Sequence, residues 1–387
     1  MEVLAKNEPS RCVEVNLDDI PRDLEQWDYD AFATITSTEL TPEQEELIVN
    51  PPAIYPRQEY VLAVHWHPEF VPMHLIKRRI ANMFPNAKDS LIIPTQHNII
   101  LDYDGYSGVE VDCYSSGFNR KVQLLLHFQT ENLVKSDTLQ AMLKHTFLYR
   151  SSQLFEFLES LVDPAFEDRR QLAAGKTNTN EELVEFVRIQ AGKIKQILME
   201  KEADIPEDAI KNKLVRNYFD AMRELYGDWL INRAQVFIKA VKDIVKEHFS
   251  LAYFYKASQV IEEARSIGAG VVIPHPEQFW PILLANYDVD GYEVWNPQSQ
   301  RYTEFLVNVV TRQNERGWHV KRPLLIFMGD DCHMSEKVKN PKEQKPEKAS
   351  REIGYQPAWD DPAIRKSLIM YGVNRKRAIE EYKERLS

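Results

Sequence analysis

The chain contains few cysteines and no long apolar run. Three cysteines among 387 residues cannot build a disulfide framework, and their odd number is typical of a reducing compartment. No apolar run reaches the roughly 20 residues that a membrane-spanning helix needs. The acidic and interrupted N-terminal stretch does not have the pattern of a signal peptide. We therefore expect a cytoplasmic protein that does not enter a membrane.

Acidic residues outnumber basic ones, 59 to 48. The formal net charge of −11 argues against a surface built to bind extended nucleic acid or anionic lipid. The sequence has neither the G-x-S-x-G motif of serine hydrolases nor a phosphate-binding P-loop. A hydrophobic content of 43% and a charged content of 28% are typical of a globular protein. A catalytic site in this chain would therefore depend on other residue types.

Short apolar runs that end in a metal-binding residue type recur along the chain. The first, Val61–Val64, leads into His65 and His67, which share one side of an extended strand and could bind one cation. At or near the ends of later runs stand His97, Glu110, His127, His275, Asp331 and His333. The carboxyl ends of parallel strands meet at one face of an α/β barrel, so we expect these side chains to converge. Imidazole with carboxylate suits Zn, Mn or Fe.

Strands that alternate with helices predict an α/β fold with a parallel barrel. The seven predicted strands span residues 60–64, 90–94, 108–111, 122–126, 270–274, 291–295 and 323–328. The predicted order is an N-terminal extension (1–57), a first barrel part (58–134), a helical insertion (135–251), a second barrel part (252–334), and a Lys-rich loop with C-terminal helices (335–387). The insertion could be a scaffold that only packs, or a cap over the site.

The order of these motifs resembles the PHP (polymerase and histidinol phosphatase) family. The family pattern is H-x-H, a His after strand two, a G-[IV]-E strand, a His after strand four, an H-P after strand five and a terminal D-x-H. Here it reads His65-Trp66-His67, His97, Gly108-Val109-Glu110, His127, His275-Pro276 and Asp331-Cys332-His333. The resemblance covers roughly residues 59–334. It implies a distorted seven-stranded (β/α)7 TIM-like barrel and a metal-dependent phosphoesterase.

The resemblance also implies two or three divalent transition metals. One would be held by His65, His67, Glu110 and Asp331; Glu110 would bridge to a second with His127 and His275; His97, His333 and, with less support, His74 would hold a third. A hydroxide activated by the metals would attack phosphorus in line, with Glu110 and Asp331 in the catalytic set. The expected substrate is a small-molecule or short nucleotide phosphoester.

Some positions depart from the family pattern. Ala63 stands where the family usually has an Asp, and residues 68–74 replace a Ser-Asp-Gly stretch. Within that segment, either Glu69 or His74 could replace the missing acidic ligand. Asp330 takes the place of a small residue and has no role that the sequence assigns.

Two other functions remain open. An amidohydrolase-type enzyme that cleaves a C–N bond also begins with H-x-H, but it commonly ends in a lone Asp and often has a bridging Lys, which no strand end here supplies. The other is a non-catalytic metal-binding barrel. The loop over residues 336–352 has six Lys or Arg against four Glu. It is either a solvated connector or a segment that closes over an anionic substrate.

Overall fold

The computed structural model describes residues 16–317, 322–339 and 344–387. The chain forms two compact units. One contains the residues up to Thr38 and Leu148–Ser250, and we call it the helical unit. The other contains Glu39–Phe147 and Leu251–Ser387, and we call it the sheet unit. No helix in the described ranges is both long enough and apolar enough to cross a membrane. The cytoplasmic location stays a prediction.

The helical unit packs its helices around one apolar core. Its helices are α1 (Gln26–Thr36), α5 (Tyr149–Val162), α6 (Glu167–Thr177), α7 (Glu181–Lys201), α8 (Lys213–Ala221), α9 (Arg223–Tyr226) and α10 (Asp228–His248). Phe32 of α1 is buried in the same core as residues of α5, α7, α8 and α10. The segment before Thr38 therefore belongs to the helical unit, although more than 100 residues separate it from α5.

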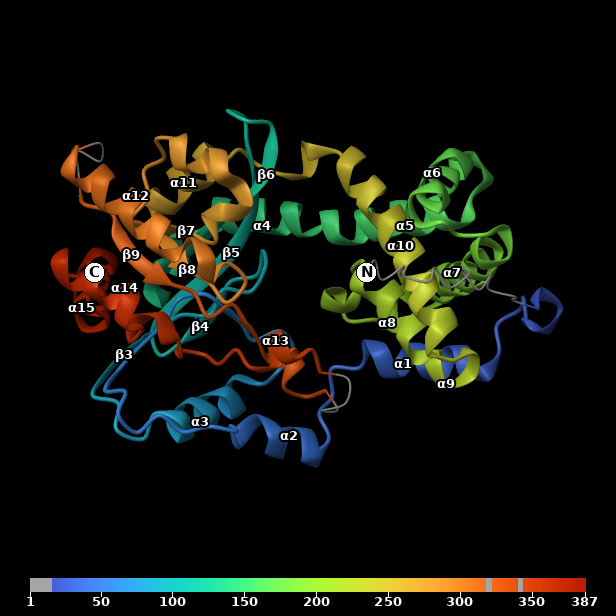
Figure 1. Ribbon diagram of the computed structural model, residues 1–387, viewed down its shortest axis with the longest axis horizontal. Coiled ribbons are helices and arrows are strands. Elements are labelled where there is room, and N and C mark those ends of the chain that lie inside the picture. Colours follow the sequence, from blue (N-terminus) through green and yellow to red (C-terminus); the bar gives the residue numbers. More distant parts are fainter. Residues whose placement is uncertain (1–15, 318–321, 340–343) are drawn as a thin grey trace, which may run out of the picture. The chain divides into compact units, whose positions relative to one another are not determined.

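The described residues of the sheet unit form ten strands in three sheets, and Figure 1 labels most of these strands. The strands are β1 (Tyr60–Ala63), β2 (Trp66–His67), β3 (Asp89–Ile92), β4 (Leu101–Tyr103), β5 (Tyr106–Ser115), β6 (Arg120–Gln129), β7 (Gly270–Ile273), β8 (Gly291–Trp295), β9 (Leu325–Met328) and β10 (Cys332–His333). β1 pairs with β3 and β2 pairs with β10, both in parallel. The remaining six form a mixed sheet in the order β4-β5-β6-β7-β8-β9.

The six-stranded sheet corrects the prediction of an all-parallel barrel. The predicted third and fourth strands lie within β5 and β6, which form a long antiparallel hairpin, and β7 pairs antiparallel with β6. The physical reason is the connection of only four residues, 116–119, because a parallel pair needs a crossover of a dozen or more residues. The described strands show a mixed α/β fold and no closed seven-stranded barrel.

Helices of the sheet unit cover its strands. They are α2 (Pro42–Val49), α3 (Met73–Met83), α4 (Asp137–Phe147), α11 (Ala257–Ser266), α12 (Thr303–Glu315), α13 (Pro346–Ala349), α14 (Pro362–Met370) and α15 (Arg375–Leu386). α11 and α12 lie beside β7 and β8 in Figure 1. Tyr382 of α15 is buried against Gly270 of β7, where an added Cβ would lie 2.4 Å from the tyrosine oxygen. The C-terminal helix is thus part of the core that supports the strands.

Candidate metal centre

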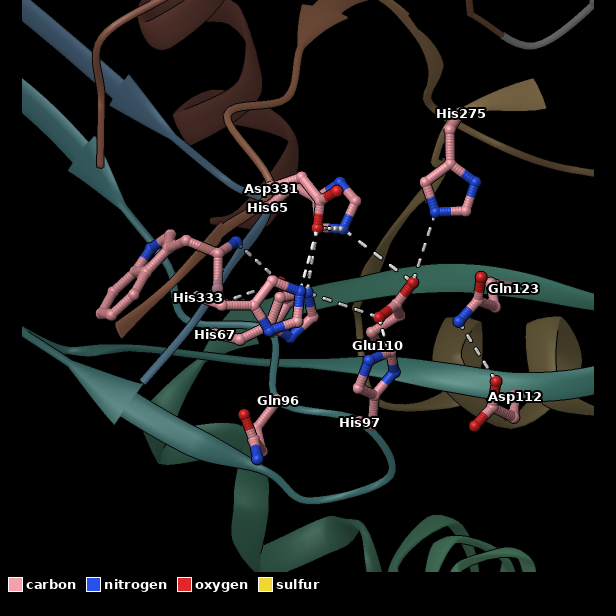
Figure 2. A network of polar contacts seen from close by, with 12 residues as sticks. His65, His67, Gln96, His97, Glu110, Asp112, Gln123, His275, Asp331 and His333 are labelled. Atoms are coloured by element: carbon pink, nitrogen blue, oxygen red, sulfur yellow. Dashed lines mark hydrogen bonds and ion pairs between the residues drawn. The ribbon is translucent and has the colours of Figure 1, made fainter. Parts of the chain in front are cut away.

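Seven of the nine predicted ligands come together in the sheet unit. Figure 2 shows His65, His67, His97, Glu110, His275, Asp331 and His333 around one centre. Glu110 lies inside β5, while the others lie at strand ends or in the loops that follow, as the prediction requires. Three triplets have ligand atoms within 4.8 Å of one another: His65–Glu110–His275, His65–His67–Asp331 and His67–His97–Glu110.

Glu110 lies between two groups of imidazoles. Its Oε1 is 3.6 Å from His275 Nε2 and 3.9 Å from His65 Nε2. Its Oε2 is 3.6 Å from His67 Nε2 and 2.7 Å from His97 Nδ1. Two ligand atoms on one tetrahedral zinc ion lie about 3.4 Å apart. The Glu110 carboxylate is therefore placed so that each oxygen could serve a different ion.

Asp331, which directly precedes β10, lies close to three imidazoles of the same group. Its Oδ1 lies 3.8 Å from His65 Nε2, 3.6 Å from His67 Nε2 and 3.4 Å from His333 Nε2. The His333 ring also stacks on His67, with 4.3 Å between the ring centroids. His333 thus adjoins the three triplets without being a member of any one of them.

The buried atoms of the centre fit a cation. Among the described residues, His65 Nε2 and Glu110 Oε2 are buried and make no hydrogen bond, although His97 Nδ1 lies at ion-pair distance, 2.7 Å, from Glu110 Oε2. Burying a polar atom without a partner costs free energy, and such atoms are uncommon in folded proteins. A divalent transition metal would satisfy them, because imidazole nitrogen and carboxylate oxygen are its usual ligands.

Glu293 supports this centre and was not predicted from the sequence. Its Oε1 accepts a hydrogen bond from His65 Nδ1 at 2.7 Å, and its Oε2 accepts one from the His275 backbone N–H at 2.7 Å. This bond leaves the His65 Nε2 lone pair for an ion, as in carboxylate–histidine–metal arrangements. A Cβ at residue 329 would lie 1.3 Å from Glu293 Oε1, so Gly329 provides the space. A charged residue inside the apolar strand β8 was the available signal.

Burial and neighbouring charges set the protonation of the centre. Burial disfavours a protonated His65, but the adjacent Glu293 outweighs it and raises the pKa of His65 to about 10. Burial, together with the neighbouring His333, lowers the pKa of His67 to about 3. For Glu110, burial opposes ionisation, yet His97 and His275 hold its pKa well below the usual value. At neutral pH, His67 and Glu110 are thus already in their metal-binding forms, while an ion must displace a proton from His65.

Backbone strain concentrates at the same place. Of the seven described non-glycine residues with positive φ, four belong to the centre or its surroundings: Glu69 (53°), Asn98 (55°), His275 (27°) and Asp331 (47°). Few non-glycine residues adopt such angles, and those that do cluster at functional sites. Holding these residues in strained backbone conformations costs free energy, which the surrounding contacts must offset.

His127 and His74, also predicted as ligands, do not join the cluster. His127 Nε2 lies 2.8 Å from Val64 O and its Nδ1 lies 2.8 Å from the Tyr382 oxygen, so both ring nitrogens have partners. The prediction assumed that His127 ends a parallel strand, whereas β6 runs antiparallel to β5 and β7. His74 is exposed in the first turn of α3.

Two acidic residues in the departures from the family pattern have distinct places. Glu69 Oε1 lies 3.5 Å from His333 Nδ1, and its Oε2 accepts a hydrogen bond from Ser335 N at 2.9 Å, so Glu69 borders the centre. Asp330 is buried and accepts hydrogen bonds from Gly354 N and Gln356 Nε2. Burial raises the pKa of Asp330 to about 7, and its contacts hold a later segment of the chain.

The Lys-rich loop is only partly a solvated segment. Lys337 is buried and donates hydrogen bonds to Ala349 O, Arg351 O and Glu352 Oε1 at 2.6, 2.5 and 2.8 Å. Lys339 pairs with Glu336 at 2.8 Å. Lys342 lies outside the described residues. Lys337 and Lys339 are therefore engaged in contacts within the protein and are not free, solvated charges.

Comparisons with known proteins do not place the chain in a family. No family model matches it, and no curated protein matches it. A solved structure of a protein from Bifidobacterium adolescentis, provisionally named a metal-dependent phosphoesterase, is similar over 81% of this chain and 96% of that chain. The identity is 15% and the TM-score is 0.38. At this level, the neighbour supports no conclusion about this chain.

Proposed function

We propose that this protein is a metal-dependent phosphoesterase of the PHP family. The observation that carries the proposal is the buried Glu110 carboxylate, whose two oxygens face two different groups of imidazoles. The order of motifs along the sequence supports the same assignment. The proposed substrate is a small-molecule or short nucleotide phosphoester.

The proposed centre holds two or three divalent ions of Zn, Mn or Fe. His65, His67 and Glu110 each belong to two of the three triplets of ligand atoms, so neighbouring ions would share ligands. Bound ions would polarise a phosphoryl oxygen and make hydroxide available at neutral pH. Glu293 fixes the ring of His65, and Asp331 presents Oδ1 to three imidazoles.

The substrate would approach from the side of His97 and His333. Their side chains are 32% and 23% exposed, whereas those of His65, His67 and Glu110 are 1% exposed. The buried members can hold an ion while the two exposed imidazoles border the opening through which a phosphoester could reach it. Exposed imidazoles could also donate hydrogen bonds to phosphoryl oxygens.

The amidohydrolase alternative is less well supported. That family often has a bridging lysine, whereas a carboxylate, Glu110, lies between the imidazoles here. Both families share the H-x-H start, so the test must compare the two reactions directly.

The decisive experiment joins metal analysis with a substrate screen. Protein purified with a metal supplement should contain two or three transition-metal ions per chain, measured by elemental analysis. The same preparation should hydrolyse phosphate esters and leave amides intact, and a chelator should abolish the activity. One ion or none per chain would contradict the multinuclear centre, and amide hydrolysis without phosphoester hydrolysis would favour the alternative.

A further inference from the structure

We propose that Arg351 and Gln298 are positioning residues that make Asp331 bind an ion through Oδ1 alone. Arg351 Nη1 and Gln298 Nε2 each lie 2.7 Å from Asp331 Oδ2, the oxygen that is turned away from the imidazoles. The inference rests on the metal centre of the proposed function. It does not depend on which bond the enzyme cleaves.

Arg351 holds both the side chain and the backbone of Asp331. Nη1 donates to Oδ2 and also to the Asp331 carbonyl at 3.0 Å, and the side chain of Arg351 is only 5% exposed. Charge-assisted hydrogen bonds of a buried guanidinium are stronger than neutral ones. Because Asp331 has a strained φ of 47°, a clamp on both its carbonyl and its carboxylate can stabilise that conformation.

The backbone of Arg351 is itself anchored. Its carbonyl accepts hydrogen bonds from Lys337 Nζ at 2.5 Å and from Cys332 Sγ at 3.3 Å. The two carboxylate oxygens of the next residue, Glu352, accept hydrogen bonds from Arg79 Nε at 3.0 Å and Arg79 Nη2 at 2.6 Å. The segment around Arg351 is therefore fixed on three sides. A rigidly held arginine can keep the carboxylate in one orientation, which a solvated arginine cannot.

Gln298 reaches the same oxygen from another part of the chain. It is an exposed residue of the loop after β8, and its backbone N–H donates to Asn296 Oδ1 at 3.0 Å. Two donors on Oδ2 occupy the lone pairs with which that oxygen would chelate an ion. Asp331 then offers one oxygen only, and that oxygen faces His65, His67 and His333.

Neither residue touches the ion in this arrangement, so their effect should be on metal affinity. Residues that hold the ligands of a metal typically change its affinity by about 10–100-fold when they are replaced. Losing the clamp frees Asp331 to rotate and to relax its backbone, so R351Q should bind Mn²⁺ about 10–100-fold more weakly. R351K keeps the charge and should lie between R351Q and the parent. Q298A should weaken binding a few-fold.

The test is a titration of the metal-free full chain with Mn²⁺ in competition with a chromophoric chelator. R170Q is the matched control: Arg170 is a buried arginine of the helical unit that pairs with Glu167, and R170Q should bind Mn²⁺ like the parent. Circular dichroism shows whether each variant is folded. If R351Q fails to fold, the exposed Q298A and the conservative R351K decide.

The outcomes separate this inference from the function it rests on. Parental protein that binds no Mn²⁺ or Zn²⁺ would overturn the metal centre, and the inference with it. Parental protein that binds, with R351Q and Q298A within twofold of it or tighter, would overturn the positioning role alone. Weaker binding by folded R351Q, partial recovery by R351K and an unchanged R170Q would support it.

Discussion

The two units bury charge in opposite ways. In the helical unit, the buried Asp28 of α1 accepts hydrogen bonds from Lys193 Nζ of α7 at 2.9 Å and from the Tyr218 hydroxyl of α8. It also accepts the Glu25 backbone N–H at 2.8 Å. In the sheet unit, Glu110 is equally buried, but its Oε2 has no hydrogen-bond partner among the described residues.

The difference distinguishes charge that stabilises the fold from charge that is prepared for a ligand. Asp28 is neutralised by its own chain and ties three helices together. Glu110 Oε2 and the nearby His65 Nε2 and His97 Nδ1 are buried without a hydrogen-bond partner among the described residues, a state that costs stability without a cation. Replacements of the two carboxylate systems should therefore affect different properties of the protein.

The largest expected effect is that of E110Q. The amide keeps the shape of Glu110 but loses the negative charge that faces both groups of imidazoles. We expect loss of bound metal and a fall in phosphoester turnover on the order of 10³-fold, corresponding to several kcal/mol. Elemental analysis and steady-state rates measure both. Full turnover by E110Q would show that the Glu110 carboxylate is not needed for catalysis, and the functional difference from Asp28 would then not hold.

The converse replacement in the helical unit is K193M. It leaves Asp28 buried without its cation, which should lower the free energy of unfolding by about 3–5 kcal/mol. Urea unfolding followed by circular dichroism measures this change. The double variant D28N/K193M removes the unpaired charge and should recover part of the loss. Metal content per folded chain should remain that of the parent. A lower metal content would show that the Asp28–Lys193 pair affects metal binding as well as stability.

A smaller effect concerns His127, a buried polar residue of the sheet unit that is satisfied as Asp28 is. Burial lowers its pKa to about 3, whereas an unfolded histidine has a pKa of about 6.5. The unfolded state therefore takes up the proton first as pH falls. Stability from neutral His127 is complete above about pH 6.5 and decreases by about 1.4 kcal/mol per pH unit on the way to pH 3.

H127Q should flatten this pH dependence. Glutamine does not titrate. Between pH 6 and pH 4, the free energy of unfolding should therefore decrease less for H127Q than for the parent. The difference should equal the contribution of one titrating proton. Urea unfolding at several pH values, with the exposed His145 replaced as H145Q for comparison, measures the slopes. Equal slopes for H127Q and the parent would mean that His127 is not held neutral. Metal content should be retained, since His127 is outside the cluster.

The sequence predicted which side chains lie close together better than it predicted the strands that carry them. Apolar runs ending in His or Asp mark His65, His67, His275 and Asp331 because buried strands are locally apolar and their ends are not. The antiparallel direction of β6 depends on pairing between distant segments, which local periodicity does not encode, and His127 was therefore misplaced.

The supporting residues were harder to predict. Glu293 resembles an ordinary residue of a strand until the space at Gly329 and the ring of His65 are known. Arg351 follows Asp331 by 20 residues, and its contact with the Asp331 carboxylate is a tertiary contact. Such contacts follow from tertiary packing, and no spacing in the sequence announces them.

The smallest expected effect concerns the remaining lysines of the loop after β10. Lys337 and Lys339 are engaged in the fold, so any capture of an anionic substrate by this loop would depend on Lys345 and Lys348 among its described lysines. Exposed charges are screened over about 10 Å at 0.1 M salt, so each contributes little. The double variant K345Q/K348Q should raise KM for a phosphoester by about twofold at low salt and by nothing measurable at 0.5 M.

Deleting residues 337–350 should have a much larger effect than this double variant. The deletion removes Lys337, which anchors Arg351, and so it should weaken metal binding as well as substrate binding. Comparing KM and metal content for both variants across ionic strengths separates the two roles. A tenfold, salt-sensitive increase in KM for K345Q/K348Q with unchanged metal content would show that these lysines capture the substrate. The loop would then act by its charge, and its anchoring contacts would be secondary to catalysis.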